Sequence, residues 1–180
     1  MKPCLNSLFL IVYACFLCLS VFRLGGYSSA PVDDYAVVID AGSTGTRCFV
    51  FHVTIDSDDV RNVTSSQCGR LSPGVSSFVN KTSELPQYMA PLLLNAAKII
   101  PTRFQIKTSV YIKGTAGMRL LPNETQSAIW KSLVKGLNKR IDVPFLIKRQ
   151  NVGTIDGRKE AFFAVLASNY IAKSIDGNLQ

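Results

Sequence analysis

The stretch from Ile39 to Arg47, IDAGSTGTR, constrains the fold of this chain more than any other feature. It begins at the end of Tyr35–Ile39 (YAVVI), whose β-branched and aromatic residues are typical of a buried strand. It is followed by Cys48–Val53 (CFVFHV), a second segment of the same kind. The small residues between the two segments predict a hairpin loop that exposes its backbone directly after a strand.

This loop has the composition of an anion-binding site. Gly42 and Gly45 allow positive φ angles, and their missing side chains let a ligand approach the backbone amides. Free N–H groups beside the hydroxyls of Ser43, Thr44 and Thr46 make a concave site that suits phosphate. A polar turn without a ligand is the competing interpretation, and these residues alone leave both open.

Asp40 bears on this choice, because a carboxylate does not suit a bare phosphate. A divalent cation between the two removes the conflict, since hard cations bind carboxylate, water and phosphate oxygens together. The loop is not a Walker loop, because it lacks the Gly-Lys-Ser/Thr ending and no helix follows it. If the loop binds phosphate, the sequence therefore favours a cation beside Asp40.

The composition allows one globular domain and argues against a nucleic-acid partner. The chain has 180 residues, of which 47% are hydrophobic, enough for about one domain with its own core. The net charge of +8 is not clustered, because the acids concentrate between Asp33 and Asp59 and the basic residues are spread over the rest. Lys131, Lys135 and Lys139 have helical spacing, which is typical of a solvated face.

Residues 5–22 form an uncharged apolar segment with a basic residue on each side. As a helix, its 18 residues span roughly 27 Å, close to the thickness of thin secretory-pathway bilayers. We expect a transmembrane signal anchor, with residues 1–4 as a cytosolic tail and residues 23–34 as a lumenal stem. A signal peptide over residues 1–30, cleaved after small residues, is the alternative, and it predicts a secreted protein.

Both interpretations send the chain into the secretory lumen. Asn62, Asn80 and Asn123 each begin an Asn-X-Thr glycosylation sequon. Of the five cysteines, Cys48 and Cys68 lie beyond the apolar segment, where the compartment is oxidising. They bridge adjacent strands, or Cys48 is a buried thiol; their spacing does not decide between the two.

The remainder of the chain predicts one α/β domain with three strands ahead of its first helix. The further elements that we expect are a strand over Val63–Leu71, a helix from Thr82 or Ser83 to before Pro101, a strand over Ser109–Lys113, a helix from Asn123 through Leu137, a short strand over Phe145–Ile147 and a helix from about Gly157 to Ala172. Asn123 and Gln126 resemble a capping box, and Asp156 is the expected cap of the last helix.

Two more stretches bear on chemistry. GTAGMR, which starts at Gly114, places Thr115 at the end of a strand, where a hydroxyl can reach a shared ligand. Glu160 lies in the first turn of the last expected helix. Taken singly, the first is an ordinary loop and the second a helix-dipole acid. Together with the first loop they provide what attack of water on a terminal phosphoryl group requires.

Three motifs carry a resemblance to a known family: DAGSTGTR from Asp40, GTAGMRLLP from Gly114, and DGRKEAFFAVLASNY from Asp156. In order and spacing they resemble the first three signature regions of the apyrase or nucleoside triphosphate diphosphohydrolase family. SPGVSSF, from Ser72, resembles the matching part of its intracellular, Golgi and lysosomal-type nucleoside diphosphatases. The resemblance covers essentially everything from Tyr35 onward.

The resemblance implies the two-lobed actin-like, ribonuclease H-like fold and hydrolysis of nucleoside di- and triphosphates, with UDP and GDP favoured, in the Golgi or another secretory membrane. It implies Ca²⁺ or Mg²⁺ as cofactor, held through water by Asp40 and Thr115, and Glu160 as the general base. The phosphate-binding residues it implies are Ser43, Thr44, Gly45, Thr46, Arg47 and Thr115.

The chain departs from the family pattern in four places. Gly114 stands where alanine or cysteine is more usual. Ala161 stands where a glycine is usual, and Val165 stands where an aromatic residue is usual. No second phosphate loop of the form Asp-Leu/Met-Gly-Gly-Ala-Ser/Thr occurs up to Gln180. We therefore expect residues 35–180 to be a truncated first lobe, inactive alone. A non-catalytic membrane glycoprotein that keeps a nucleotide-binding half-site is the alternative.

Overall fold

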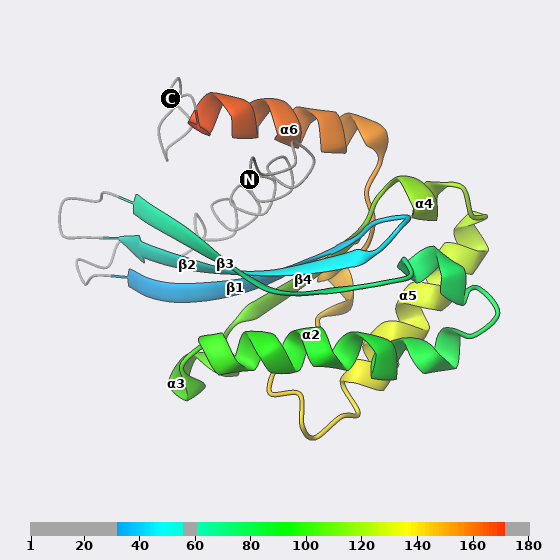
Figure 1. Cartoon of the computed structure of the whole chain (residues 1–180), viewed down its shortest axis with the longest axis horizontal. Helices are drawn as coiled ribbons and strands as arrows, with labels where there is room; N and C mark the ends of the chain where they lie inside the picture. Colours follow the sequence, from blue (N-terminus) through cyan, green and yellow to red (C-terminus); the bar gives the residue numbers. More distant parts are fainter. Residues whose placement is uncertain (1–31, 56–60, 172–180) are drawn as a thin grey trace.

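The computed structural model describes residues 32–55 and 61–171, so the predicted anchor over residues 5–22 lies outside the described residues. Within the described ranges, none of the helices combines the length and the apolar character that crossing a bilayer demands. The described residues form a five-stranded sheet with helices on both faces (Figure 1).

The sheet has the strand order β3-β2-β1-β4-β5. Its strands are β1 (Val32–Ala41), β2 (Thr46–Ile55), β3 (Arg61–Leu71), β4 (Ser109–Gly114) and β5 (Val152–Thr154). β2 runs antiparallel to both β1 and β3, whereas β4 runs parallel to β1 and β5 runs parallel to β4. The carboxyl ends of β1 and β4 therefore meet at one edge, which is where open α/β sheets bind ligands.

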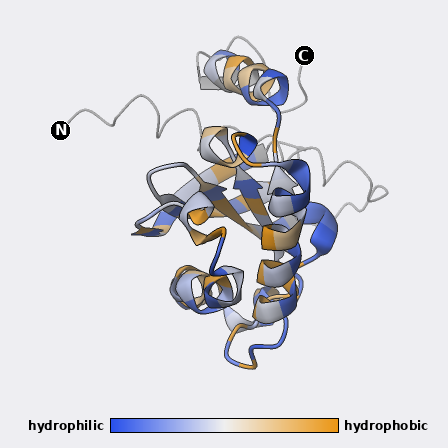
Figure 2. Cartoon of the chain, turned by 90° about the vertical axis from the view of Figure 1, so that its right-hand side faces the viewer, coloured by the Kyte–Doolittle hydropathy of each residue, from blue (hydrophilic) through white to orange (hydrophobic). Residues whose placement is uncertain are grey.

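Two long helices, α2 (Leu85–Ile99) and α5 (Asn123–Leu137), lie on one face of the sheet, and α6 (Gly157–Ile171) lies on the other (Figure 1). Figure 2 shows the same three layers from the end of the molecule. The short helical elements are η2 (Val75–Phe78), η3 (Thr82–Glu84), α3 (Thr102–Gln105), α4 (Ala116–Arg119) and η4 (Arg149–Asn151).

The alternation of side chains along β1 divides the core between the two faces. Val37 and Ile39 belong to the larger cluster, which packs with α2 and α5. Ala36 and Val38 point the other way, into a smaller cluster with aromatic residues of β2 and β4. Asp40 has the same parity as Ala36 and Val38, so its carboxylate lies on the face toward α6.

The predicted hairpin is confirmed, with Ala41 and Thr46 as the last register pair before the loop. Cys48 on β2 and Cys68 on β3 form a disulfide with their Cα atoms 5.1 Å apart. Of the two possibilities that the spacing left open, the structure shows the bridge between adjacent strands.

The predicted strand over Phe145–Ile147 is wrong, because the third parallel position is taken by β5. Phe145 and Ile147 are buried, which explains their apolar pattern. The backbone hydrogen bonds of Ile147 are made with the side chain of Asn138 and not with a neighbouring strand. Its Nδ2 donates to the Ile147 carbonyl at 2.9 Å, and its Oδ1 accepts from the Ile147 amide at 2.9 Å.

The expected bounds of α5 are confirmed, but the predicted N-caps of two helices differ from the structure. The α5 helix has Pro122 as its N-cap and no capping side chain, and the Gln126 side chain donates to the Leu121 carbonyl at 2.8 Å. Likewise, Thr82 belongs to η3, which leads into α2 without a side-chain cap. The predicted cap of α6 is confirmed, because Asp156 Oδ1 accepts from the Lys159 amide at 2.8 Å.

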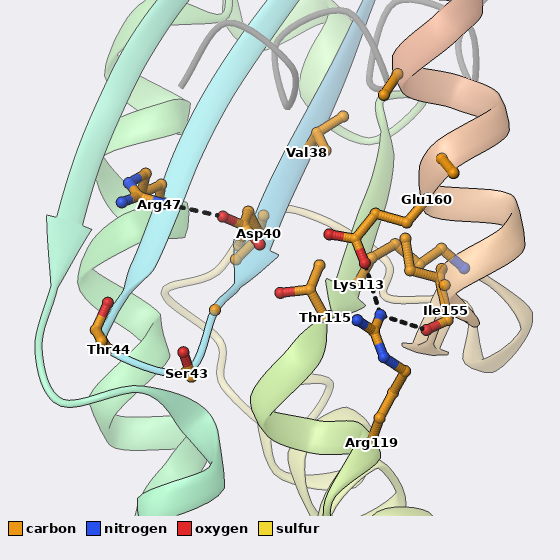
Figure 3. Close-up of a pocket in the computed structure, with 15 residues that line it drawn as sticks. Val38, Asp40, Ser43, Thr44, Arg47, Lys113, Thr115, Arg119, Ile155 and Glu160 are labelled. Carbon is orange, nitrogen blue, oxygen red and sulfur yellow. Dashed lines mark hydrogen bonds and ion pairs between the residues drawn. The ribbon is translucent and has the colours of Figure 1, made fainter. Parts of the chain in front are cut away.

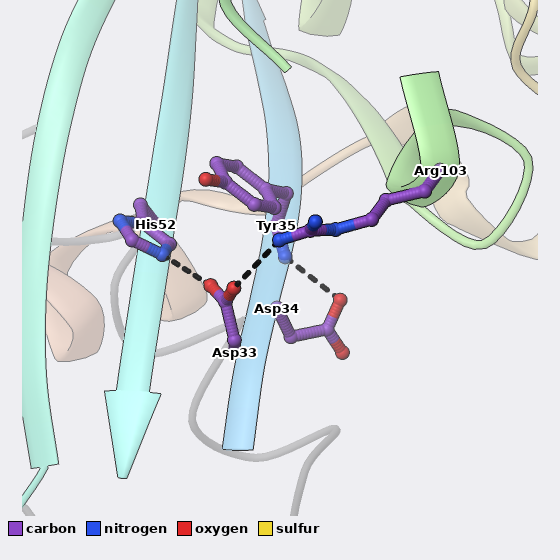
Figure 4. A network of polar contacts seen from close by, with 5 residues as sticks. All are labelled: Asp33, Asp34, Tyr35, His52 and Arg103. Atoms are coloured by element: carbon purple, nitrogen blue, oxygen red, sulfur yellow. Dashed lines mark hydrogen bonds and ion pairs between the residues drawn. The ribbon is translucent and has the colours of Figure 1, made fainter. Parts of the chain in front are cut away.

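A polar cluster lies at the opposite end of β1 from Asp40 (Figure 4). The Asp33 carboxylate is 2.5 Å from His52 Nε2 and 3.9 Å from Arg103 Nη2. The His52 ring also stacks on Tyr35 at 4.4 Å between centroids. These contacts join β1, β2 and α3, and they give the single histidine of the chain a structural environment.

Candidate active site

A cleft of about 600 Å³ lies at the carboxyl ends of β1 and β4. Its three walls come from the loop over residues 42–45 (the first loop), the segment over residues 115–117 (the second loop) and the start of α6. The first loop lines the cleft with Gly42, Ser43 and Thr44, and the second loop lines it with Thr115. Figure 3 shows the side chains of Asp40, Thr115 and Glu160 pointing into this space from three different elements. The structure thus brings together three residues that the sequence singled out separately.

The first loop presents only part of its predicted binding set to the cleft. Ser43 and Thr44 are exposed and line the cleft. Gly45 and Thr46 are buried and do not line it. Among the described glycines, only Gly69 has a positive φ, so the expected use of that conformation in the first loop is wrong.

Gly45 is needed for close packing against β3 and not for a positive φ angle in the turn. A Cβ atom added there would lie 2.8 Å from the Leu71 carbonyl oxygen, at the end of β3. Below the loop, Ser72 Oγ donates to the Thr44 carbonyl at 3.3 Å, and Gly74 packs against the carbonyls of Gly42 and Ser43 so closely that a Cβ would collide with both. The segment after β3 therefore supports the first loop from beneath.

The second loop packs directly against the first. The Thr115 amide donates to the Ala41 carbonyl at 3.4 Å, which links the ends of β4 and β1. A Cβ added at Gly117 would lie 2.6 Å from Ser43 Cβ, a distance that real Cβ contacts do not reach. The absence of a side chain at Gly117 thus lets the Thr115 hydroxyl and the first loop share one cleft.

Asp40 is the most buried charged group in the cleft, with 2% of its side chain exposed. Its Oδ2 lies 3.2 Å from Arg47 Nη1, whereas its Oδ1 has no hydrogen-bond partner. Burial raises the pKa of this carboxyl to about 6, and Glu160 adds to the shift, although the charge and hydrogen bond of Arg47 oppose it. A buried carboxylate oxygen without a partner is costly unless a cation or water completes it.

Glu160 lies in the first turn of α6 and is paired with Arg119 of α4. Arg119 Nη1 is 2.6 Å from Glu160 Oε2 and donates to the Ile155 carbonyl at 3.3 Å. The two side chains are 43% and 33% exposed, for glutamate and arginine respectively. Arg119 thus fixes the carboxylate relative to the second loop and to the chain entering α6.

The sequence reasoning missed two cations in the cleft, Arg119 and Lys113. Arg119 ends the GTAGMR motif, so its position four residues after Thr115 could have indicated that it lies near the cleft. Lys113 lies on the same face of the sheet as Asp40, because the two are register partners on β4 and β1. Burial, together with the charges of Lys159 and Arg149, lowers the pKa of the Lys113 ammonium.

The donor set suits a hard divalent cation held largely through water. Asp40 Oδ1 and the Thr115 hydroxyl offer oxygen, the ligand that Ca²⁺ and Mg²⁺ prefer. The described residues contain no cluster of three or more His, Cys, Asp or Glu side chains that could hold a metal directly. Mg²⁺ in particular keeps several waters and binds through few carboxylates plus substrate phosphate, so the residues fit such an ion.

Comparison with known proteins shows which family the sequence matches. The model of the GDA1/CD39 (nucleoside phosphatase) family matches residues 28–179. Nucleoside-triphosphatase ntp-1 of Caenorhabditis elegans is 32% identical over 188 residues, covering 93% of this chain and 34% of that protein. Ectonucleoside triphosphate diphosphohydrolase 7 of Homo sapiens is 32% identical over 168 residues, covering 86% of this chain and 28% of that protein.

Nucleoside-diphosphatase mig-23 of Caenorhabditis elegans is 35% identical over 143 residues, covering 76% of this chain and 26% of that protein. The chain spans about a third or less of the length of these curated relatives.

Among solved structures, the crystal structure of nucleoside triphosphate hydrolases from Neospora caninum has a TM-score of 0.54 at 15% identity, covering 90% of this chain and 35% of that chain. At this identity the likeness shows the fold alone, and it agrees with the expected actin-like α/β lobe. With the family model matching most of its length, the chain belongs to the GDA1/CD39 (nucleoside phosphatase) family.

Proposed function

We propose that this chain supplies one side of the active site of an enzyme that hydrolyses the terminal phosphate of nucleoside di- and triphosphates, with UDP and GDP as favoured substrates. One observation carries the proposal: Asp40, Thr115 and Glu160, from three separate elements, line the same cleft as the hydroxyls of the first loop. Phosphoryl transfer depends mainly on positioning and charge stabilisation, which such a cleft provides.

In the proposed reaction, Ser43 and Thr44 hold the terminal phosphate with their hydroxyls and the loop amides. Glu160 accepts a proton from the attacking water while the water oxygen bonds to phosphorus. The bond from phosphorus to the bridging oxygen breaks, and the shortened nucleotide leaves with the electron pair. Arg119 occupies only Oε2 of Glu160 among the described contacts, which leaves Oε1 for the water.

We assign Ca²⁺ or Mg²⁺ to the region between Asp40 Oδ1 and Thr115. When bound, such an ion neutralises charge on the phosphate oxygens. Asp40 would hold the hydrated ion through its Oδ1, the carboxylate oxygen that lacks a hydrogen bond. Arg47, which was predicted to contact phosphate, is tied to the other oxygen of Asp40; we propose that it keeps this carboxylate in place.

A second lobe completes the cleft in this proposal, since the curated relatives are about three times as long as the matched region. The cleft residues of this chain alone face solvent on one side, where charge stabilisation is weak. We therefore expect negligible hydrolysis from residues 32–171 by themselves. A protein that only binds nucleotide through this half-site is the second candidate, favoured by Ala161 on the cleft wall where a glycine is expected.

We place the site in the lumen of the Golgi or another secretory compartment. The Cys48–Cys68 disulfide suits an oxidising compartment. Asn62, Asn80 and Asn123 are all exposed, so glycans can be attached at each without disturbing the core.

The test is phosphate release by the protein produced from the complete coding sequence, with UDP, GDP and ATP, in Ca²⁺, Mg²⁺ or chelator. The proposal expects cation-dependent release, with diphosphates favoured. Nucleotide binding without release in any cation would favour the half-site instead.

A further inference from the structure

Lys113 differs from the other charged groups of the cleft in having no partner. Asp40 is paired with Arg47, and Glu160 is paired with Arg119. Within residues 32–55 and 61–171, the Lys113 ammonium makes no hydrogen bond or ion pair, although it is half-buried and lines the cleft. Since both cleft carboxylates are already paired with arginines, the positive charge of Lys113 is left uncompensated.

The register of the sheet explains how a lysine comes to this place. Lys113 on β4 is the partner of Asp40 on β1 and of Gly153 on β5. It follows Tyr111 on the same face, whose neighbours form the smaller apolar cluster. Lys113 is thus the point at which this apolar face becomes polar, directly beside the cleft.

The surroundings of Lys113 are positive and open. Lys159 of α6 and Arg149 of η4 are close enough to act on its charge. Gly153, on the far side from Asp40, has no side chain, and a Cβ built there would meet no atom within 4 Å. Figure 3 shows the Lys113 side chain extending from β4 toward α6, beneath Glu160.

We propose that Lys113 is an additional binding point for a phosphate oxyanion, on the Glu160 side of the cleft. A half-buried, unpaired cation costs free energy that an anionic ligand recovers by forming a charge-assisted hydrogen bond. A purely solvated lysine would be exposed, as Lys131 of α5 is, whereas Lys113 is half-buried. The ligand is either the terminal phosphate of a bound nucleotide or the orthophosphate that hydrolysis releases.

The inference rests on the proposed function for the source of the phosphate, but its test requires no turnover. Binding of sodium orthophosphate and of UDP to the full chain is measured by isothermal titration calorimetry at constant ionic strength. The variants are Lys113→Met, which removes the charge at similar length, and Lys113→Arg, which keeps it. Lys131→Met, on the exposed face of α5, is the matched control, and thermal unfolding checks the fold of each variant.

Lys113→Met is expected to weaken orthophosphate binding about tenfold, the effect of losing one charge-assisted hydrogen bond. Lys113→Arg and Lys131→Met are expected to stay within about twofold of wild type. An equal loss for UDP identifies the terminal phosphate as the ligand, and a loss confined to orthophosphate identifies the released product.

Unchanged affinity of Lys113→Met for both ligands would overturn the inference, as would a wild-type chain that binds neither at millimolar concentration. Lys113-dependent phosphate binding in a complete protein that does not hydrolyse nucleotides would overturn the proposed function alone.

Discussion

Arg119 Nη1 lies 2.6 Å from Glu160 Oε2. The arginine at the end of α4 thus holds the carboxylate in the first turn of α6. The pair spans 41 positions of the sequence and joins two of the three walls of the cleft. Because the same guanidinium also bonds the Ile155 carbonyl, it fixes both the side chain and the backbone that carries it. This contact turns two separate motifs into one site.

We predict that Arg119→Ala lowers kcat of the complete enzyme by about 10- to 100-fold with little change in KM, because it misplaces the base and not the substrate. Glu160→Gln should lower kcat by about 10²-fold or more. The double variant should be little worse than Glu160→Gln alone, since the two residues act as a unit. Arg158→Ala, an exposed arginine in the same turn, is the control; additive losses would contradict the coupling.

The buried carboxylate of Asp40 should make the stability of the protein depend on pH. Burial raises its pKa from the ordinary value of 3.8 to about 6 in the folded protein, so the folded state binds the proton more tightly than the unfolded state does. The contribution of Asp40 to the free energy of unfolding is therefore fully present below pH 3.8, and it is lost as the pH rises through 6. Asp40→Asn, which does not titrate, should gain about 3 kcal/mol relative to wild type between pH 3.5 and pH 7.5.

Urea unfolding of both proteins across this range measures the difference. Asp142→Asn is the control, because its hydrogen bond with Arg140 lowers the pKa of Asp142 and gives the opposite sign. A pH-independent difference for Asp40→Asn would mean that the carboxylate is not desolvated as the structure shows.

The Cys48–Cys68 bridge should contribute about 3 kcal/mol to stability, the value expected for a loop of this size. The two cysteines are 20 residues apart and join β2 to β3, next to the first loop. Replacing both with alanine should lower the urea midpoint of the oxidised protein and remove its response to reductant. A variant as stable as wild type would show that the bridge does not form in solution.

Gly117 and Gly74 should be intolerant of alanine because neighbouring carbonyls and Ser43 occupy the space of a Cβ. We expect Gly117→Ala to lower stability by about 1–3 kcal/mol and to weaken phosphate binding by pushing the two loops apart. Gly153→Ala meets no atom within 4 Å and is the matched control. Equal effects at Gly117 and Gly153 would contradict the close packing of the loops.

Much of the fold and half of the site were predictable because their signals are local. The YAVVI and CFVFHV segments with a small-residue loop between them predict a hairpin. The glycines and hydroxyl residues of the same loop predict phosphate binding. Asp156 caps α6 through its own side chain, so its role is readable from neighbouring residues.

The remainder depended on contacts between distant residues. Phe145–Ile147 has an apolar pattern, but the Asn138 amide, nine positions earlier, takes the place of a neighbouring strand. The pairing of Arg119 with Glu160 follows from strand register and loop packing, as does the lack of a partner for Lys113 among the residues that the structure describes. No single segment carries that information.

The most direct test of the account is single-turnover phosphate release from UDP by the complete protein, comparing wild type with Glu160→Gln. Each is assayed with Mg²⁺, with Ca²⁺ and with chelator, after UDP binding has been confirmed for both proteins. If Asp40, Thr115 and Glu160 form one hydrolytic site, wild type releases phosphate only with a cation, and Glu160→Gln binds UDP but releases phosphate at least about 10²-fold more slowly. Equal rates in the two proteins, or equal release in chelator, would contradict the account.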